Sequence, residues 1–337
     1  MIIPSVAVAA FILAGCGENI QSLNQAAIER LAAGDTQGAE LLLKKALEAD
    51  PVNKVLVGNL GEVFFRTKKW DDAIQLFQKA QSIEGLAGDS GLKTRLAEAF
   101  VMKGDLPSAY PLLQELVKEN PKDEYLLFLH GMTSSSPGPA IKSLKEAIQL
   151  KPDRKESYLA LARAQAWEGD IATAKTTLDE CKAKAGESPD IFLYEVALYL
   201  RDNDIENARK TIDSAPEALR GNPMTRLFQA YLDLGDRKVT EARAAFESLA
   251  DNGDVGSRAR LGAALCMLIQ DDPNLAIEMC DEVIAKHPKE VVAHTLLGLG
   301  QLKRLQKFLA KKSLETSLEL NPDQPAIRAL ADRLGGR

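Results

Sequence analysis

Apolar and polar positions in this chain recur in a pattern that repeats about every 34 residues. Each period contains a small alanine, and further apolar or small residues follow it by four and by seven positions. These spacings place all three side chains on one face of a helix. A proline or glycine often follows by twelve positions and ends that helix. The alanines, used below as anchors, are Ala39, Ala73, Ala109, Ala140, Ala174, Ala208, Ala242, Ala276 and Ala310.

A second helix is expected before each anchor. Bulky residues lie nine positions upstream in three of the periods, as Phe64, Phe100 and Tyr199. An alanine on one helix allows close approach, and the bulky side chain of the other helix fills the space beside it. Each period therefore predicts a pair of helices, here called A and B, with the anchor on helix B. Self-similarity at a fixed period indicates a repeat array.

This pattern resembles the tetratricopeptide repeat family over residues 20–322, as nine repeats. The resemblance implies an all-α, right-handed solenoid of helix pairs. Residues 323–337 are expected to form a capping helix with Arg328, Asp332 and Arg333 on its outer side. The fourth repeat is about three residues short, with a Ser-Ser-Ser-Pro-Gly segment at 134–138, and the seventh is expected to gain about two residues around 236–240.

Turn signals support the repeat assignment. A glycine or asparagine followed by aspartate precedes four anchors by five and four positions. The glycine or asparagine can adopt the left-handed conformation that ends helix A, and the aspartate can cap helix B. These pairs are Gly34-Asp35, Gly104-Asp105, Gly169-Asp170 and Asn203-Asp204.

Charge and cysteine content narrow the possible chemistry. The formal net charge is −6, whereas nucleic-acid binding requires a basic face. No CxxC pair or clustered His and Cys residues indicate a metal, and no motif indicates a cofactor. Cys181 and Cys280 replace residues of the helix B face and are expected to be buried. A disulfide between Cys266 and Cys280, on the two helices of one repeat, is conceivable in an oxidising compartment.

The N-terminal segment has the features of a targeting sequence. Residues 2–13 are apolar except for Ser5, and Leu13-Ala14-Gly15 precede Cys16. This resembles the lipobox of bacterial lipoproteins, although no Lys or Arg precedes the apolar run. The resemblance implies a signal peptide at 1–15, a lipidated Cys16 and a short tether at 16–19. Gly17, directly after this cysteine, then favours anchoring in the outer membrane, with the protein facing the periplasm. The alternative is an apolar tail with an incidental cysteine.

In the tetratricopeptide family, helix A lines the concave surface where partners bind. By that resemblance, we expect a partner-binding groove and no catalytic residues. An apolar group of the groove near the C-terminus is either open to a partner or covered by the fold. The candidate groove residues are Glu62, Phe65, Arg66, Glu98, Met102, Arg163, Trp167, Arg201, Leu265, Leu268, Ile269 and Leu302.

Two readings of individual groove positions are disfavoured. Glu62 and Glu98 are the stacked carboxylates that could suggest glycoside hydrolysis, but nothing else in the sequence supports it. Family members that clamp peptide carboxylates use asparagines and lysines in these columns, where this chain has Glu62, Glu98 and Arg163. The sequence therefore predicts a non-enzymatic scaffold for a protein or peptide, with membrane contact only through a lipid anchor.

The resemblance further suggests an outer-membrane lipoprotein that supports assembly of an envelope export machine for exopolysaccharide, pili or secretion. Lipoproteins of exosortase-linked PEP-CTERM systems are the nearest likeness. The alternatives are a soluble cytoplasmic adaptor and a regulatory module of a separate enzyme.

Overall fold

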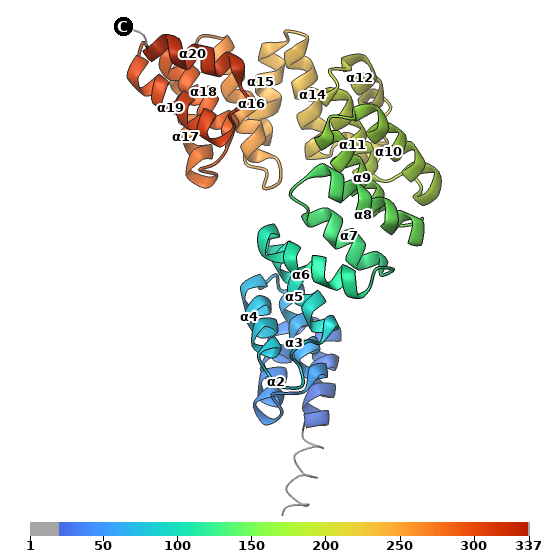
Figure 1. The fold of residues 1–337 in the computed structure, drawn as a ribbon. Coiled ribbons are helices and arrows are strands. Elements are labelled where there is room, and N and C mark those ends of the chain that lie inside the picture. Colours follow the sequence, from blue (N-terminus) through green and yellow to red (C-terminus); the bar gives the residue numbers. More distant parts are fainter. Residues whose placement is uncertain (1–19, 336–337) are drawn as a thin grey trace, which may run out of the picture. The chain divides into compact units, whose positions relative to one another are not determined.

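The computed structural model describes residues 20–335, and all regular structure in that range is helical (Figure 1). The chain divides into two compact units, one ending at Gly186 and the other beginning at Glu187. The predicted all-α solenoid of helix pairs is confirmed, because consecutive helices within each unit pack on one another in succession. The predicted segments before residue 20, including Cys16, lie outside the described residues.

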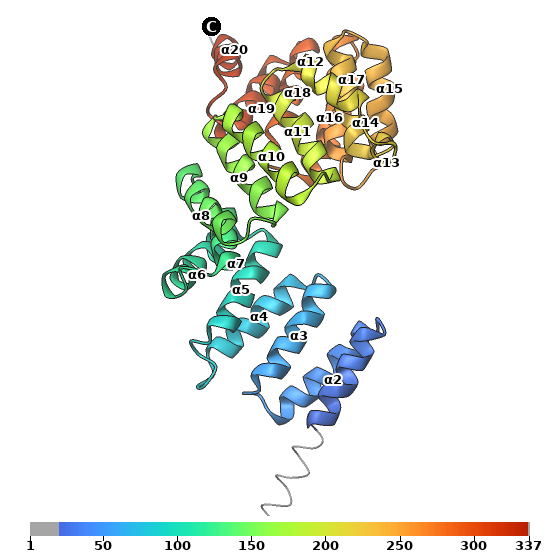
Figure 2. The ribbon, with the colours of Figure 1, turned by 90° about the vertical axis from the view of Figure 1, so that its right-hand side faces the viewer.

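The first unit contains five successive helix pairs. Figures 1 and 2 both show α2 to α5 side by side in chain order. A helix over residues 20–32 precedes α2. The others are α2 (Thr36–Ala49), α3 (Lys54–Arg66), α4 (Trp70–Gln81), α5 (Ser90–Lys103), α6 (Leu106–Glu119), α7 (Glu124–Thr133), α8 (Pro137–Leu150), α9 (Lys155–Glu168) and α10 (Ile171–Ala185).

The second unit contains four further pairs, one short helix and a terminal helix. They are α11 (Pro189–Arg201), α12 (Ile205–Asp213), α13 (Glu217–Arg220), α14 (Pro223–Gly235), α15 (Val239–Leu249), α16 (Gly256–Ile269), α17 (Pro273–Lys286), α18 (Val291–Lys303), α19 (Lys307–Leu320) and α20 (Pro325–Gly335). The terminal helix α20 packs on α19, with Ala331 buried and Arg328, Asp332 and Arg333 exposed, as expected for a cap.

The anchor register is confirmed. All nine anchors are buried, as are all residues four and seven positions after them. At helix A glycines that face helix B, a large helix B side chain fills the space: a Cβ on Gly298 would lie 2.7 Å from Leu314 Cγ, and one on Gly61 would overlap the Phe77 ring. The core is thus a ribbon of small residues on one helix against large residues on the other.

The turns between helices A and B also follow the prediction. Gly34, Gly104, Gly169 and Asn203 have positive φ. The aspartate after each accepts a hydrogen bond from the backbone amide three residues later, as Asp170 does from Thr173 at 3.0 Å. The same left-handed position is occupied by other residue types in four more repeats: Lys68, Arg237, Asp271 and Leu305.

One spacing prediction is confirmed and one is wrong. The fourth repeat is short because its helix A, α7, has only ten residues. The seventh repeat gains nothing around residues 236–240, since three residues, 236–238, separate α14 from α15, as three separate α3 from α4. The irregularity lies earlier, where α12 has nine residues and the four-residue α13 fills the connection to α14.

Candidate functional site

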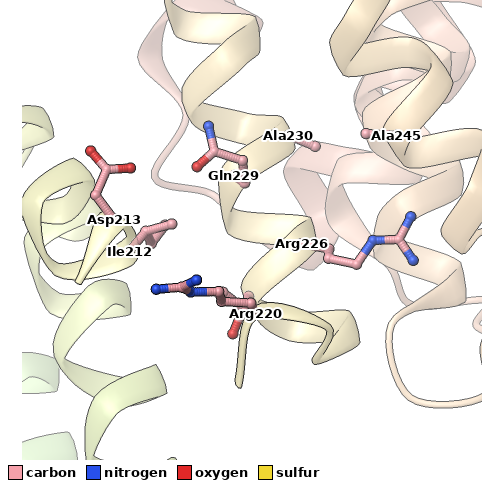
Figure 3. A pocket seen from close by; sticks show the side chains of 8 residues that line it. Ile212, Asp213, Arg220, Arg226, Gln229, Ala230 and Ala245 are labelled. Carbon is pink, nitrogen blue, oxygen red and sulfur yellow. The ribbon is translucent and has the colours of Figure 1, made fainter. Parts of the chain in front are cut away.

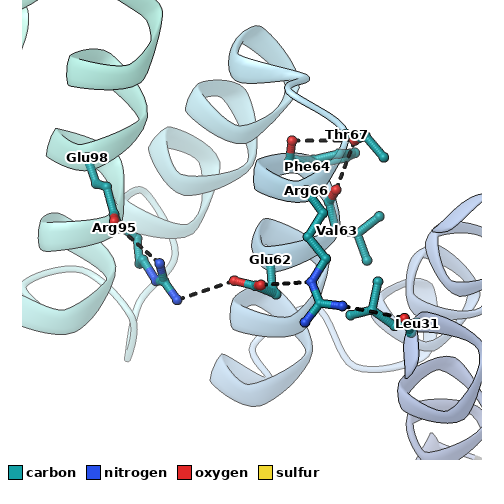
Figure 4. Close-up of polar contacts among 8 residues, drawn as sticks. All are labelled: Leu31, Glu62, Val63, Phe64, Arg66, Thr67, Arg95 and Glu98. Carbon is teal, nitrogen blue, oxygen red and sulfur yellow. Dashed lines mark hydrogen bonds and ion pairs between the residues drawn. The ribbon is translucent and has the colours of Figure 1, made fainter. Parts of the chain in front are cut away.

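A charged network crosses the A helices of the second and third repeats (Figure 4). Arg66 Nε donates to Glu62 at 3.0 Å, and Arg95 lies between Glu62, at 3.6 Å, and Glu98, at 2.9 Å. Tyr125 on α7 extends the network by donating its hydroxyl to Glu98 at 2.6 Å. Burial, followed by this hydrogen bond, raises the pKa of Tyr125, so the hydroxyl stays protonated.

This network changes the interpretation of the two glutamates. Each carboxylate is paired with a guanidinium, and Arg95 bridges them. Both carboxylates are therefore held as ion-pair partners. The arrangement joins three successive repeats through side chains. Sequence reasoning missed Arg95, which lies one helical turn before Glu98, and Tyr125, which lies on a helix where no groove residue had been selected.

Phe65 packs at the edge of the core and is not an open partner-binding residue. Its ring meets Trp70 edge-on at 5.5 Å between centroids, and the Arg95 guanidinium lies 5.4 Å from its centroid. The partly buried ring packs against the core of the first repeats. Because two neighbours already cover it, Phe65 offers less free apolar surface than its sequence position suggested.

Two other groove candidates of the first unit are open to solvent. Met102, near the end of α5, is 52% exposed, and Trp167, near the end of α9, is 50% exposed. Arg163 lies one turn before Trp167 on the same exposed side of α9. Arg201 is exposed on α11 of the second unit, so a cluster of Trp167 with both arginines stays a prediction.

The apolar group near the C-terminus forms a hollow of about 530 Å³ in the second unit, between α16 and α18. Its lining comprises Leu265, Leu268, Ile269, Leu299, Leu302, Lys303 and Leu305. Leu268 is only 5% exposed and belongs to the core, whereas Ile269 is 54% exposed and Leu265 and Leu302 are partly buried. Of the two alternatives left open for this group, cover by the fold holds for Leu268, whereas Ile269 is open to solvent. Neighbours on the next repeat cover Leu268.

A second hollow, of about 350 Å³, lies where the short α12 meets α14 (Figure 3). Arg220 and Arg226 border it, but their guanidinium groups extend in opposite directions. Arg220 Nε donates to the Ala215 carbonyl at 3.1 Å and Arg226 to Ser248 Oγ at 2.9 Å. The charges therefore do not converge on a common ligand, and we interpret this hollow as a packing gap left by the shortened helix.

His130 and the three buried cysteines have structural roles. His130 stacks on Tyr110 at 4.9 Å and its Nδ1 lies 2.9 Å from Ser143 Oγ, and burial lowers its pKa. Cys181, Cys266 and Cys280 are free and buried, so the conceivable disulfide is not formed. Burial raises the pKa of Cys266 to about 11 and of Cys280 to about 12, which keeps both as thiols. Among residues 20–335, no cluster of His, Cys, Asp and Glu could hold a metal ion.

These features define an α-helical repeat protein in which several A helices carry accessible aromatic, methionine or charged side chains. Comparison with known proteins names the repeat: tetratricopeptide repeat models match residues 30–85 and 225–291. The chain therefore contains tetratricopeptide repeats in these two segments. Their fold indicates a scaffold for protein–protein interaction.

Known proteins share these repeats at low identity. The TPR repeat-containing protein YpiA of Bacillus subtilis is 28% identical over 161 residues, which cover 47% of this chain but only 37% of YpiA. The crystal structure of a tetratricopeptide repeat protein from Parabacteroides merdae aligns with a TM-score of 0.63 at 17% identity, covering 74% of this chain and 99% of that one.

The human IFIT1 dimer with m7Gppp-AAAA aligns with a TM-score of 0.60 at 14% identity, over 93% of this chain and 79% of that one. At these identities, the likeness to both solved structures concerns the fold.

Proposed function

We propose that this protein is a scaffold whose A helices capture a protein or peptide partner. The observation that carries the proposal is the exposure of Trp167 on α9, beside Arg163. Binding energy at protein interfaces is concentrated in a few residues, and Trp and Arg are enriched among them. Trp167 lies outside the buried face of α9, which consists mainly of alanines with Tyr158 and Leu161, so its exposed half gains little from folding.

The scaffold acts in the bacterial envelope under this proposal. Lipid on Cys16 would tether it to the outer membrane, with the repeats in the periplasm, where it would support assembly of an exopolysaccharide, pilus or secretion machine such as the PEP-CTERM systems. The support is the apolar run that ends in Leu-Ala-Gly-Cys at residues 13–16. No helix in residues 20–335 is long and apolar enough to cross a membrane.

Partner binding is tested by affinity capture from envelope extract with the wild type and Trp167→Ala. We expect a loss of about 2 kcal/mol in binding free energy without loss of helical circular dichroism. Leu41→Ala is the matched control, because Leu41 is 70% exposed on the helix B α2. Unchanged capture by the folded Trp167 variant, with weakened capture by the Leu41 variant, would place the binding surface on the B helices instead.

The anchor is tested separately by fractionation and intact mass in a bacterial host. The wild type is expected in the membrane fraction with an acylated Cys16, and Cys16→Ser is expected to be released or left unprocessed. An unmodified wild type that retains residues 1–15 would refute the envelope location. It would support the soluble cytoplasmic adaptor or the regulatory module of a separate enzyme, while leaving the A-helix binding surface intact.

A further inference from the structure

The last turn between helices A and B has an unusual residue type at its left-handed position. In the described turns, this position holds glycine, asparagine or a charged residue: Gly34, Lys68, Gly104, Gly169, Asn203, Arg237 and Asp271. The ninth repeat has Leu305 there, with a φ of 61° and 82% exposure. A branched apolar residue is unfavourable in this conformation, and nearly all of its side chain faces solvent. Neither backbone preference nor packing accounts for this leucine.

A second departure follows three residues later. The position two before the anchor holds small or polar residues in the other eight repeats: Gln37, Asp71, Pro107, Gly138, Ala172, Glu206, Thr240 and Asn274. In the ninth repeat it holds Phe308, also 82% exposed. Leu305 and Phe308 are the most exposed large apolar side chains in residues 20–335. Leu305 lies in the turn between α18 and α19, and Phe308 lies in the first turn of α19, so both are at the same end of this helix pair.

Basic residues surround this apolar pair. Residues 303–312 (KRLQKFLAKK) contain five lysines and arginines and no acidic residue, in a chain with a net charge of −6. Lys303 is paired with Asp271 at 2.6 Å and Lys311 with Glu315 at 3.5 Å, whereas Arg304, Lys307 and Lys312 are exposed. Phe308, Lys307 and Lys312 border one hollow, and Leu305 borders the apolar hollow beside Ile269.

We propose that this terminal edge (Arg304, Leu305, Lys307, Phe308 and Lys312) docks on the surface of an anionic lipid bilayer. Projecting apolar side chains flanked by lysine and arginine match an interface where acyl chains lie beneath negatively charged headgroups. Leu305 and Phe308 enter the headgroup boundary while the basic residues contact phosphates. This contact is independent of any lipid on Cys16 and lies at the opposite end of the sequence.

Two other occupants fit the edge less well. A symmetric dimer would place the same patch on both copies and bring the basic clusters together, which is unfavourable. An acidic protein segment would pair with the basic residues. Leu305 and Phe308, however, are each 82% exposed, so most of their surface does not form the wall of a hollow that such a segment could fill. A fluid bilayer accepts projecting groups without a complementary pocket.

The test is flotation of the full chain carrying Cys16→Ser with vesicles of phosphatidylglycerol and phosphatidylethanolamine, compared with phosphatidylcholine vesicles. Neutral vesicles measure any contribution of the apolar N-terminal segment. We expect partitioning to the anionic vesicles to be at least about tenfold stronger than to the neutral vesicles, because each exposed basic residue adds a favourable contact with the anionic headgroups. Salt at about 0.5 M should weaken this binding by screening those contacts.

Two double variants separate the apolar and charged contributions. Leu305→Gly with Phe308→Ser, and Lys307→Glu with Lys312→Glu, are each expected to lower anionic partitioning to the level on neutral vesicles. The matched controls are Leu41→Ser and the pair Lys45→Glu with Lys142→Glu, all at exposed positions of the first unit, and both should bind as the parent does.

Equal flotation on the two vesicle types, or unchanged anionic binding by both edge variants, would overturn the proposal. Sedimentation velocity supplies the remaining outcome. If the parent floats with neither vesicle but self-associates, and the edge variants are monomeric, the edge is an interface between copies and not a membrane contact.

Discussion

Gly58 and Gly61 lie one turn apart on α3, and alanine at the two positions should have opposite effects. A Cβ on Gly58 meets nothing within 4 Å. A Cβ on Gly61 would overlap Cζ of Phe77 and lie 3.0 Å from its Cε1. Phe77 is fully buried at the position four after the second anchor, so its ring has no free space to enter.

The magnitudes follow from two contributions. Replacing a helical glycine with alanine stabilises by about 0.5–1 kcal/mol, and this gain applies to both positions. Overpacking at Gly61 costs about 1–3 kcal/mol because the Phe77 ring or the helix must shift. Gly58→Ala should therefore raise the free energy of unfolding. The free energy of unfolding of Gly61→Ala should lie about 1–3 kcal/mol below that of Gly58→Ala.

Urea denaturation followed by helical circular dichroism measures both variants, with equal slopes required before midpoints are compared. Phe77→Leu in the Gly61→Ala background is the internal control, because a smaller side chain leaves room for the new methyl group. The two substitutions should then cost less together than the sum of their separate effects. Equal stability of the two alanine variants, or additive effects in the double variant, would refute the assigned contact between helices A and B.

Three further outcomes are expected. Leu268→Asp should destabilise the second unit by several kcal/mol because it buries a carboxylate at a 5% exposed position, whereas Ile269→Asp, at a 54% exposed position, should change stability by less than about 1 kcal/mol; thermal melts showing equal losses would contradict the burial of Leu268. Burial lowers the pKa of folded His130 below 6.5, so the unfolded chain binds the proton more tightly and stability should fall as pH drops below about 6.5; His130→Phe, which keeps the stack on Tyr110, should flatten urea midpoints between pH 7 and 5. Asp89→Ala should cost about 1 kcal/mol at pH 7 by removing the cap on the Leu92 amide at 2.9 Å. The hydrogen bond from Lys54 holds the pKa of Asp89 below 3.8, so this contribution is present above that pH and is lost as pH falls through the folded value; a difference that persists at pH 2 would show another origin.

The sequence by itself determined the repeat fold. Nine anchors, with small and large residues at fixed offsets, define which face of each helix is buried, because helical periodicity converts spacing directly into direction. The Gly-Asp turns could be predicted for the same reason: a left-handed residue and a capping carboxylate act on their own backbone within three residues. The short fourth repeat was visible as well, because a missing helical turn changes the spacing between anchors.

Tertiary structure alone decided which groove residues are accessible. Leu268 and Ile269 are adjacent and equally apolar, yet the next repeat covers one and leaves the other open. Arg95 pairs with Glu62 on the preceding A helix, across 33 positions of sequence, and with Glu98 on its own helix, so no local pattern revealed that one arginine bridges the two glutamates. Spacing within one helix specifies its buried face, whereas exposure at the edge of that face depends on side chains from the neighbouring repeat. That dependence is why the anchors were predictable and the partner surface was only partly so.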